Sequence, residues 1–417
     1  MENSSLFHIN NGEDILAEEK DFEKNKQKIS EFINRQIKNP HLNIFIGSGA
    51  SIGAVPLMSK TMKDILKEHS DIKDEFCTYL DFSKPKHREC FEKFLSGSSE
   101  IVYSSEEKKI IAQYDGFSNI EMFMTYLQQK INVTRKSDVK KELNGILEKL
   151  KSGFISTIPK LSDVAYESNT LTTYKKFYKH IFDQRQNESP KLNIFTTNYD
   201  LFNEKSLEEN NINYSTGFRP GLRPSFDINQ FQYRQVDERN RYKDKWQPTT
   251  KEANLYKLHG SINWIESSEK ILQSNDGEEN IVIYPTALKH NETAQIPYSP
   301  LFRELSIQLQ KPNSTLMVIG YGFGDDHINN LIFQNIANPD FNLIVFGDTQ
   351  EDKLNFLLER NKGRNFHTIG GSYINSDNKE IKAHWFDYIV DDLLPQNDIS
   401  GNKGEGSITS AEGRDSE

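Results

Sequence analysis

The fold is decided at residues 42–51, which read Leu42-Asn43-Ile44-Phe45-Ile46-Gly47-Ser48-Gly49-Ala50-Ser51. The apolar run is too short for a helix and glycines follow it directly, so the stretch predicts a buried strand that enters a glycine-rich turn. Helical spacing resumes at Met58, Met62 and Leu66. Strand, glycine turn and helix in this order are typical of the start of a nucleotide-binding α/β fold.

Later segments have the same character, each a short apolar run that stops at glycine, proline or polar residues. They are residues 192–195, 255–258, 281–284, 316–319 and 343–346. Because helical segments separate them, they predict an α/β protein with a doubly wound, mainly parallel Rossmann-like sheet. Ligands of such sheets bind beyond the carboxyl ends of the strands. Nearly all the distinctive glycine and polar residues of this chain follow a strand.

The remaining segments complete a predicted division of the chain. Residues 1–40 are expected to supply an N-terminal helix, running from about Ala17 to Lys38. Residues 57–169 have helical spacing and predict a helical insertion or lobe. The Rossmann-like core then comprises 41–56 and 170–395. The segment 396–417 is rich in Gly, Ser, Asp and Glu and is predicted to be disordered.

Composition and charge restrict the class of protein. The 417 residues are 35% hydrophobic and 27% charged, with a net charge of -10 and a pI near 5.6. Such a chain is not built to coat nucleic acid, and direct nucleic-acid binding is not expected. Residues 214–246 carry 7 Lys and Arg against 4 Asp and Glu. This stretch predicts a long loop. Its small charge excess favours a solvated loop or a subunit contact over contact with another partner or with nucleic acid.

Location and metal content follow from two further observations. No run of 18 apolar residues and no secretion leader is visible, which predicts a cytoplasmic protein with no membrane partner. The two cysteines, Cys77 and Cys90, form no CxxC pair. We therefore expect neither structural zinc nor another bound metal.

The glycine turn is a candidate phosphate site on physical grounds alone. Glycines let the backbone approach a pyrophosphate, and a following helix presents free N–H groups and the positive end of its dipole. The fit to the dinucleotide fingerprint is imperfect, because the third glycine is Gly53 rather than residue 52. Taken alone, a plain tight turn explains Gly47–Ser51 equally well.

Several motifs taken together resemble sirtuins. Gly47–Ser51 resembles the glycine-alanine-glycine-x-serine loop of that family. Thr197-Asn198-Tyr199-Asp200 resembles its threonine-glutamine-asparagine-isoleucine-aspartate motif, and Leu258-His259-Gly260 resembles the strand that ends in its catalytic histidine. Residues 318–329 (VIGYGFGDDHIN) resemble the bacterial sirtuin-like (Sir2-like) NADase branch of antiphage defence proteins. The motifs occur in the family's order and cover roughly residues 41–56 and 190–350.

The departures from the family pattern concern the peptide substrate. Deacylating sirtuins carry a zinc ribbon of two CxxC pairs, which this chain cannot make. They also carry a proline-aspartate-phenylalanine-arginine run after the glycine loop, where this sequence reads Ala54-Val55-Pro56-Leu57-Met58. Both departures argue against a peptide-binding cleft, and neither affects the expected NAD pocket.

The resemblance implies NAD as substrate and assigns roles to individual residues. Asn198 would bind ribose hydroxyls or the attacking water, and His259 would act as base toward a ribose hydroxyl or water. Asp200 would orient the nicotinamide amide or support its loop. The structural alternatives are helix capping by Asn198 and Asp200 and a simple turn at His259. The NAD contacts are expected from Gly47, Ser48, Gly49, Ala50, Ser51, Thr197, Gly320, Tyr321, Gly322 and Asp348.

Three acidic residues have structural explanations of comparable weight. Asp348 ends a strand, where it would bind the adenine ribose or serve a turn. Asp325 and Asp326 precede a helical run, which predicts that they are N-caps.

The expected activity is hydrolysis of NAD+ to nicotinamide and ADP-ribose, used against phage by depleting NAD. One alternative is NAD-dependent ADP-ribosyl transfer to, or deacylation of, a protein. Another is a non-catalytic sensor of NAD or of an NAD-derived signal. The resemblance also implies a homo-oligomer and a HerA-like hexameric ATPase as a candidate partner.

Overall fold

The computed structural model describes residues 5–97, 102–160, 162–185, 189–242, 245–248, 251–267, 270–274, 297–374 and 379–394. Three predictions lie outside the described residues. They are the strand at 281–284, the disordered tail at 396–417 and the contribution of Lys243 to the predicted loop.

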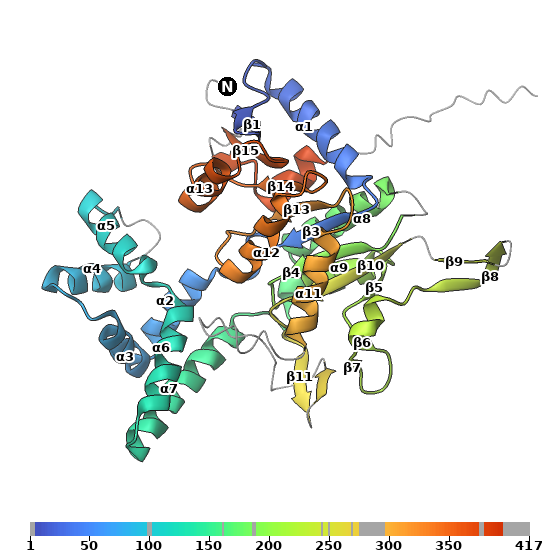
Figure 1. The fold of residues 1–417 in the computed structure, drawn as a ribbon. Helices are drawn as coiled ribbons and strands as arrows, with labels where there is room; N and C mark the ends of the chain where they lie inside the picture. Colours follow the sequence, from blue (N-terminus) through green and yellow to red (C-terminus); the bar gives the residue numbers. More distant parts are fainter. Residues whose placement is uncertain are drawn as a thin grey trace, which may run out of the picture.

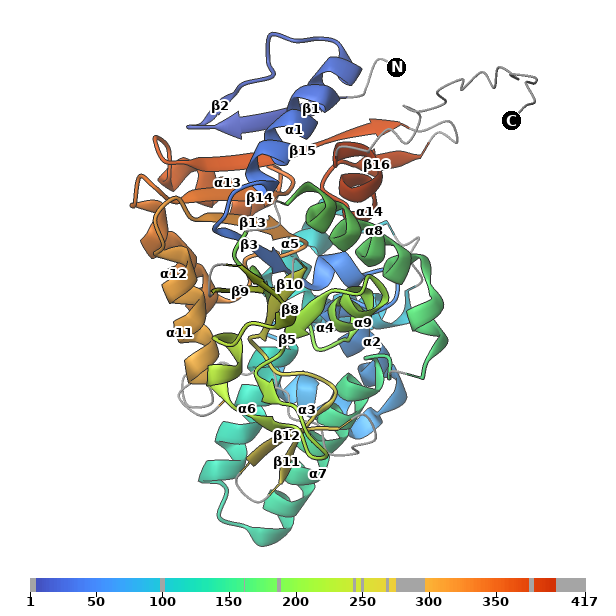
Figure 2. The same cartoon turned by 90° about the vertical axis from the view of Figure 1, so that its right-hand side faces the viewer.

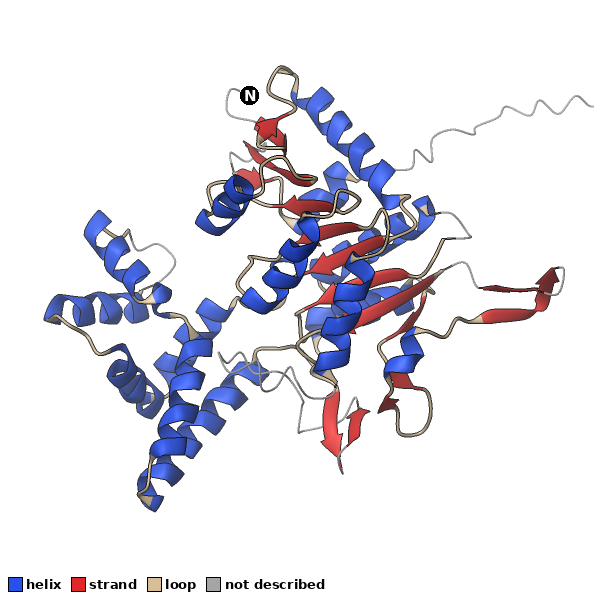
Figure 3. Ribbon diagram, in the orientation of Figure 1, coloured by secondary structure: helices blue, strands red, loops and turns tan. Residues whose placement is uncertain are grey.

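A mainly parallel sheet forms the centre of the protein (Figures 1 and 3). Among the described residues its ten strands have the order β2-β1-β15-β14-β13-β3-β4-β10-β5, with β16 beside β15. The strands from β15 to β5 are parallel to their neighbours. They are β3 Leu42–Ile46, β4 Leu192–Thr196, β5 Asn213–Ser215, β10 Glu252–Lys257, β13 Thr315–Ile319, β14 Asn342–Phe346 and β15 Phe366–Ile374.

The chain order reverses between β3 and β13, as it does in a doubly wound sheet. From β3 the chain adds β4 and β10 on one side, and it later adds β13, β14 and β15 on the other. Ile46 pairs with both Ile319 and Thr196, and Thr196 pairs with Lys257, so four strands end at one level. The predicted fold class is confirmed, and its ligand crevice is expected at this reversal.

The alternation of side chains along each strand divides the core into two layers. Ile44 and Ile46 of β3 pack on the side of α1 Phe22–Ile37, α8 Asn169–Gln184 and α9 Phe202–Glu209. Phe45 packs on the other side, with α11 Tyr298–Leu309, α12 Asp326–Ile336 and α13 Asp352–Arg360. Because both faces are covered, β3, β4 and β13 are buried at every residue.

The helical lobe predicted between the first two core strands is confirmed. Figure 1 shows it projecting from the sheet. Its described helices are α2 Met58–Glu68, α3 Ser70–Leu80, α4 Pro85–Ser96, α5 Ser105–Gln113, α6 Ile120–Val133 and α7 Ser137–Ser156. A buried aromatic cluster that includes Phe76, Phe91 and Phe123 fills its interior. The lobe touches the core where the rings of Phe154 and Tyr199 meet edge to face at 5.5 Å.

The N-terminal segment holds more than the single predicted helix. Before α1 it forms β1 Ser5–Asn10 and β2 Glu13–Asp14, and β1 pairs antiparallel with β15. The helix begins at Phe22, later than expected, because the Asp21 carboxylate accepts hydrogen bonds from the N–H groups of Glu23 and Lys24. A six-residue antiparallel strand of mixed polarity has no signal comparable to the apolar runs of the parallel strands.

Residues 214–246 do not form the single long loop that was predicted. They include β6 Phe218–Arg219, β7 Ser225–Phe226 and most of a ribbon in which β8 Val236–Tyr242 pairs with β9 Lys245–Pro248. Strands β6 and β7 join β11 Trp264–Ser267 and β12 Lys270–Gln273 in a small antiparallel sheet. The β8–β9 ribbon projects from the core (Figure 1). Such two- to seven-residue strands are stabilised by their partners rather than by local sequence.

The last described segment returns to the edge of the sheet, as Figure 2 shows beside β15. Strand β16 Glu380–Lys382 pairs with β15, and α14 Phe386–Tyr388 and a π-helical turn at Ile389–Leu393 follow. None of the helices in the described ranges has the length and apolar character needed to cross a membrane.

Two histidines meet where β1 joins β15. His8 Nε2 lies 3.0 Å from His367 Nδ1, and both rings pack on Phe32, with centroid distances of 4.5 and 4.7 Å. Burial and the neighbouring His367 lower the pKa of His8 from 6.5 to about 3. Burial lowers the pKa of His367 to about 4. The unfolded chain therefore binds protons between pH 6.5 and 4 that the folded chain excludes.

We expect this histidine pair to make the fold acid-sensitive. Its contribution to stability is complete above pH 6.5 and is lost as the pH falls toward 4, by up to about 1.4 kcal/mol per pH unit for each histidine. A His8→Phe/His367→Phe variant keeps two rings against Phe32 but cannot titrate, so its free energy of unfolding should fall less steeply. Urea unfolding at pH 7, 6 and 5 measures both slopes, and equal slopes would refute the assignment.

Candidate functional site

The glycine turns that follow β3 and β13 pack against each other, backbone to backbone. The Gly47 N–H donates to Ile319 O at 2.9 Å, and the Gly49 N–H donates to Gly320 O at 2.8 Å. A Cβ on Gly320 would lie 2.5 Å from the backbone nitrogen of Ala50, and Gly320 has a φ of +65°. A Cβ on Gly47 would collide with the carbonyl oxygen of Gly320. These three glycines therefore have a packing role, and their contact with NAD stays a prediction.

Asn198 is held at the end of β4 by contacts to the first glycine turn. Thr196 Oγ1 donates to Ile46 O at 2.7 Å and accepts from the Asn198 N–H at 3.0 Å. The Asn198 side-chain amide donates to Gly47 O at 3.1 Å and to Ser51 Oγ at 3.3 Å. Asn198 is 5% exposed, and its Oδ1 has no hydrogen-bond partner within the described structure. The side chain does not cap a helix, and its orphan oxygen is an acceptor aimed at nothing in the protein.

His259 follows β10 and faces a carboxylate from another part of the chain. Its Nε2 lies 3.0 Å from Asp325 Oδ2, and the two side chains are 9% exposed each. The other oxygen of Asp325 accepts from the N–H groups of His327 and Ile328, at 3.1 and 3.4 Å. The predicted N-cap role of Asp325 is thus confirmed. The N-cap prediction for Asp326 is wrong, because this residue already lies in the first turn of α12.

The approach of Asp325 to His259 was missed by the sequence analysis. In this position the carboxylate is placed to stabilise positive charge that develops on the ring. The available signal was positional, since Asp325 lies in the glycine-rich turn after β13 and His259 lies just after β10. These two strands are not neighbours in the sheet, so the contact could not be inferred from either motif alone.

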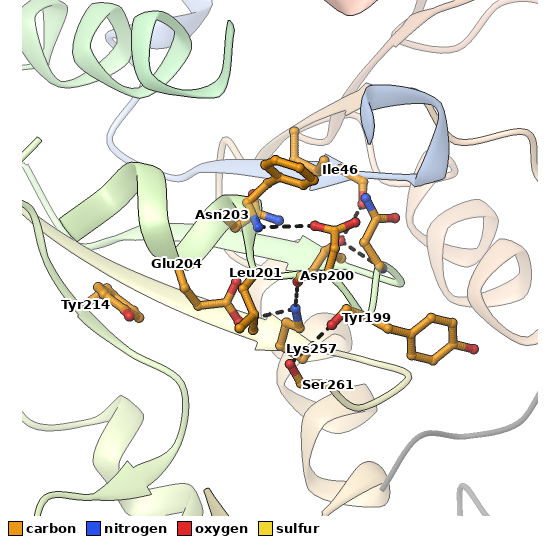
Figure 4. Close-up of polar contacts among 12 residues, drawn as sticks. Ile46, Tyr199, Asp200, Leu201, Asn203, Glu204, Tyr214, Lys257 and Ser261 are labelled. Atoms are coloured by element: carbon orange, nitrogen blue, oxygen red, sulfur yellow. Dashed lines mark hydrogen bonds and ion pairs between the residues drawn. The ribbon is translucent and has the colours of Figure 1, made fainter. Parts of the chain in front are cut away.

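Asp200 belongs to a buried cluster of charged groups (Figure 4). Lys257 is fully buried; its Nζ donates to the backbone oxygen of Asp200 and lies 3.2 Å from Glu204 Oε1. Burial raises the pKa of Asp200 and of Glu204, while the Lys257 charge acts in the opposite direction on both. The Asp200 carboxylate accepts from the Phe202 N–H at 3.2 Å. This geometry fits support of the loop, the second of the two roles predicted for Asp200.

A cavity of 410 Å³ lies between these residues and the lobe. Its polar side carries Asn198, Asp200, His259 and Asp325, which come from three different strand ends. The lobe supplies an apolar wall that includes Met58, Phe154 and Ile158. The cavity is also lined by Ser48, Ser51, Val55, Pro56, Thr61, Asn119, Thr157, Thr197, Tyr199, Tyr321, Gly322 and Gly324.

A second cavity, of 650 Å³, adjoins the first around Ser48, Tyr321 and Gly322, which line both. It extends over the ends of β13 and β14 to residues 384–387. All predicted site residues except Gly47 and Asp348 line one or both cavities. Asp348 instead accepts from the Gln350 N–H at 3.0 Å and lies 3.6 Å from Lys382 Nζ. These contacts fit a structural role for Asp348 in its turn, which is the alternative to binding the adenine ribose.

Comparison with known proteins bears on part of this site. Residues 192–362 match the family model of the SIR2-like domain. The matched segment includes Asn198, His259 and Gly320–Gly322, but neither the turn after β3 nor the lobe. No curated protein matches the chain. The match supports a Sir2-like family and an NAD-related activity. Within the described parts of the chain, no three His, Cys, Asp or Glu side chains are grouped so as to hold a metal ion.

The contact between the glycine turns predicts different tolerance at two neighbouring glycines. Gly320→Ala should lower the free energy of unfolding by about 2 kcal/mol or more, because the methyl group meets the Ala50 backbone and the positive φ is strained. Gly322→Ala is the matched control, since a Cβ there meets nothing within 4 Å. Denaturant unfolding of both variants measures the difference. Equal stabilities would contradict the packing role of Gly320.

The buried cluster predicts a strong effect of removing its cation. Lys257→Met leaves the Glu204 carboxylate buried without its partner and should cost about 3–5 kcal/mol of stability. The double variant Lys257→Met/Glu204→Leu removes both charges and should recover at least half of that loss. Urea unfolding of the single and double variants gives the coupling energy. A double variant as unstable as Lys257→Met would show that the broken ion pair is not the source of the lost stability.

Proposed function

We propose, with the match to the SIR2-like domain as premise, that this chain hydrolyses NAD+ at the nicotinamide–ribose bond. The products are nicotinamide and ADP-ribose. The observation that carries the proposal is the smaller cavity, where the orphan oxygen of Asn198 and the ring of His259 meet beside the glycine turns. Asp325 completes this group by its approach to His259.

Cleavage of the nicotinamide–ribose bond requires few catalytic groups. Nicotinamide leaves as a neutral molecule from a cationic glycoside, so the departing nitrogen needs no acid. The transition state is oxocarbenium-like, and the site must hold the ribose, stabilise positive charge and position water. Asn198 Oδ1 accepts a hydrogen bond from a ribose hydroxyl or from the water that attacks the anomeric carbon. His259 takes the proton that this water releases, and Asp325 stabilises the resulting imidazolium.

The two adjoining cavities match the two ends of a dinucleotide. The smaller cavity holds the Asn198 and His259 side chains, so the nicotinamide ribose belongs there. The larger cavity then takes the adenosine end, and the diphosphate passes Ser48 and Gly322, which both cavities share. A ligand that crosses the topological reversal of the sheet in this way is typical of doubly wound folds.

Water is favoured as the acceptor over a protein side chain. The lobe contributes the apolar side chains of Met58, Phe154 and Ile158 to the lining of the smaller cavity. The sequence also lacks the cysteines of the zinc ribbon that borders the peptide cleft of deacylating sirtuins. Protein ADP-ribosyl transfer or deacylation is therefore the second candidate. A non-catalytic NAD sensor is the third, and the presence of both Asn198 and His259 argues against it.

The biological setting of the proposal comes from the resemblance to defence proteins alone. We place the enzyme in the cytoplasm, acting against phage by depleting NAD. Unrestrained loss of NAD would kill the host, so we expect the resting enzyme to be held inactive. A homo-oligomer and a HerA-like hexameric ATPase are the candidate means of control.

Chromatography of NAD+ incubated with the purified chain tests the activity directly. The protein is assayed alone and after co-expression with the product of the neighbouring gene. We expect wild type to release nicotinamide and ADP-ribose in equal amounts. Asn198→Ala and His259→Ala should each reduce the rate on the order of 100-fold or more, since each removes a group at the reacting centre. Asn330→Ala and His69→Ala, outside both cavities, are the matched controls.

The alternatives predict different products from the same reaction. Transfer of labelled ADP-ribose to protein, without free ADP-ribose, would favour the transferase. Release of an acyl group from an acyl-lysine peptide in step with nicotinamide would favour the deacylase. Binding of NAD+ with no product in either preparation would favour the sensor and overturn the hydrolase.

A further inference from the structure

The larger cavity has a wall that lies outside the matched SIR2-like segment. Residues 384–387 (His384-Trp385-Phe386-Asp387) follow β16 and face the turns after β3, β13 and β14. No sequence motif points to this segment, and the proposed reaction uses none of its side chains. Its contribution to the cavity is therefore a separate observation.

The wall is fixed in place from behind. The Ala383 N–H donates to Gly371 O at 2.8 Å, which ties the segment to β15. The buried ring of Phe386 meets the rings of Tyr174 and Phe177 of α8 edge to face, at 4.9 and 5.2 Å. Trp385 precedes this anchor in the chain, and the residue is 40% exposed and lines the cavity. An indole held on a rigid backbone is preorganised to receive a flat ligand.

The exposed lining of the cavity is unusually apolar. Ile52, Leu57 and Trp385 are 52%, 43% and 40% exposed, and all three line the cavity. Large apolar side chains that stay exposed around one hollow mark a place where a ligand covers them. Because Trp385 offers a flat aromatic face, the fitting ligand group is a planar base.

The charges around the cavity are of one sign. Among the lining residues that the structure describes there is no Lys or Arg, and the carboxylates are Glu351 and Asp387. Burial lowers the pKa of His384, so its ring is neutral at pH 7. Lys382, two residues before His384 and outside the lining, is already 3.0 Å from Glu380 Oε1 and 3.6 Å from Asp348 Oδ2. This end of the site disfavours an additional phosphate.

We propose that Trp385 stacks on the nucleobase of the bound dinucleotide. Glu351 and Asp387 then favour a dinucleotide in which the ribose next to that base carries no 2′-phosphate. The site thus takes NAD rather than NADP. This inference rests on the proposed function for the identity of the ligand, but it concerns binding and needs no turnover. Trp385 is a binding residue contributed by a segment that the SIR2-like match does not include.

The stacking is tested with ADP-ribose, which binds without being cleaved. Tryptophan fluorescence and calorimetry follow its titration into wild type, Trp385→Phe, Trp385→Ala and the control Tyr233→Ala, whose exposed ring lies outside both cavities. We expect quenching in wild type and in the control, and its loss in Trp385→Phe. Affinity should fall only a few-fold in Trp385→Phe and on the order of 10- to 100-fold in Trp385→Ala. Thermal unfolding verifies that each variant is folded.

The charge selection is tested with 2′-phospho-ADP-ribose in the same assay. Wild type should bind it at least about tenfold more weakly than ADP-ribose, because the phosphate meets two carboxylates. The Glu351→Gln/Asp387→Asn variant should reduce the ratio between the two affinities, chiefly because it binds the phosphorylated ligand more tightly. An unchanged ratio would overturn the selection by these carboxylates.

The outcomes separate this inference from the proposed reaction. Absence of quenching in wild type, or equal affinity in wild type and Trp385→Ala, overturns the stacking even if NAD+ is hydrolysed. Quenching that depends on Trp385 supports it even if chromatography shows no hydrolysis, in which case the hydrolase proposal fails alone.

Discussion

The whole site depends on the contact between two glycine turns at the reversal of the sheet. Gly47 and Gly49 donate to the end of β13 and its turn, and Gly320 leaves no room for a side chain against Ala50. This contact sets the spacing of β3 and β13 at their carboxyl ends. The Asn198 amide bonds to the same turn, and both cavities meet beside it. The packing of the protein's own backbone therefore requires glycine at these positions, whether or not a ligand is bound.

Around that contact the protein separates two kinds of polar group. Lys257 and Glu204 are buried, pair with each other and hold the loop that carries Asp200. Asn198 and His259 line the cavity, and one oxygen of Asn198 is left without a protein partner. The ion pair gives rigidity, whereas the Asn198 oxygen belongs to a residue that lines the cavity and is available to a ligand. Apolar side chains of the lobe line the same cavity.

The core could be predicted because parallel strands are buried on both faces and so read as short apolar runs. Each described run, such as residues 42–46 and 316–319, is a strand where the sequence indicated one. Strand β1 and the ribbon after β7 could not be predicted, since antiparallel strands of mixed polarity have no such pattern. The approach of Asp325 to His259 and the wall at Trp385 escaped for another reason. Each of these two features brings together segments that lie far apart in the chain, and no local sequence motif indicates such a contact.

The position of β3 also has a consequence for synthesis. This strand is made well before one of its two neighbours, β13, which starts only at Thr315. Likewise β1 is made long before its partner β15 at residues 366–374. A nascent chain that stops after β10 holds Asn198 and His259 but has neither Asp325 nor the second glycine turn. The two halves of the cavity system are thus assembled only after the chain has been made as far as residues 384–387. A product truncated before β13 therefore lacks part of the lining of both cavities.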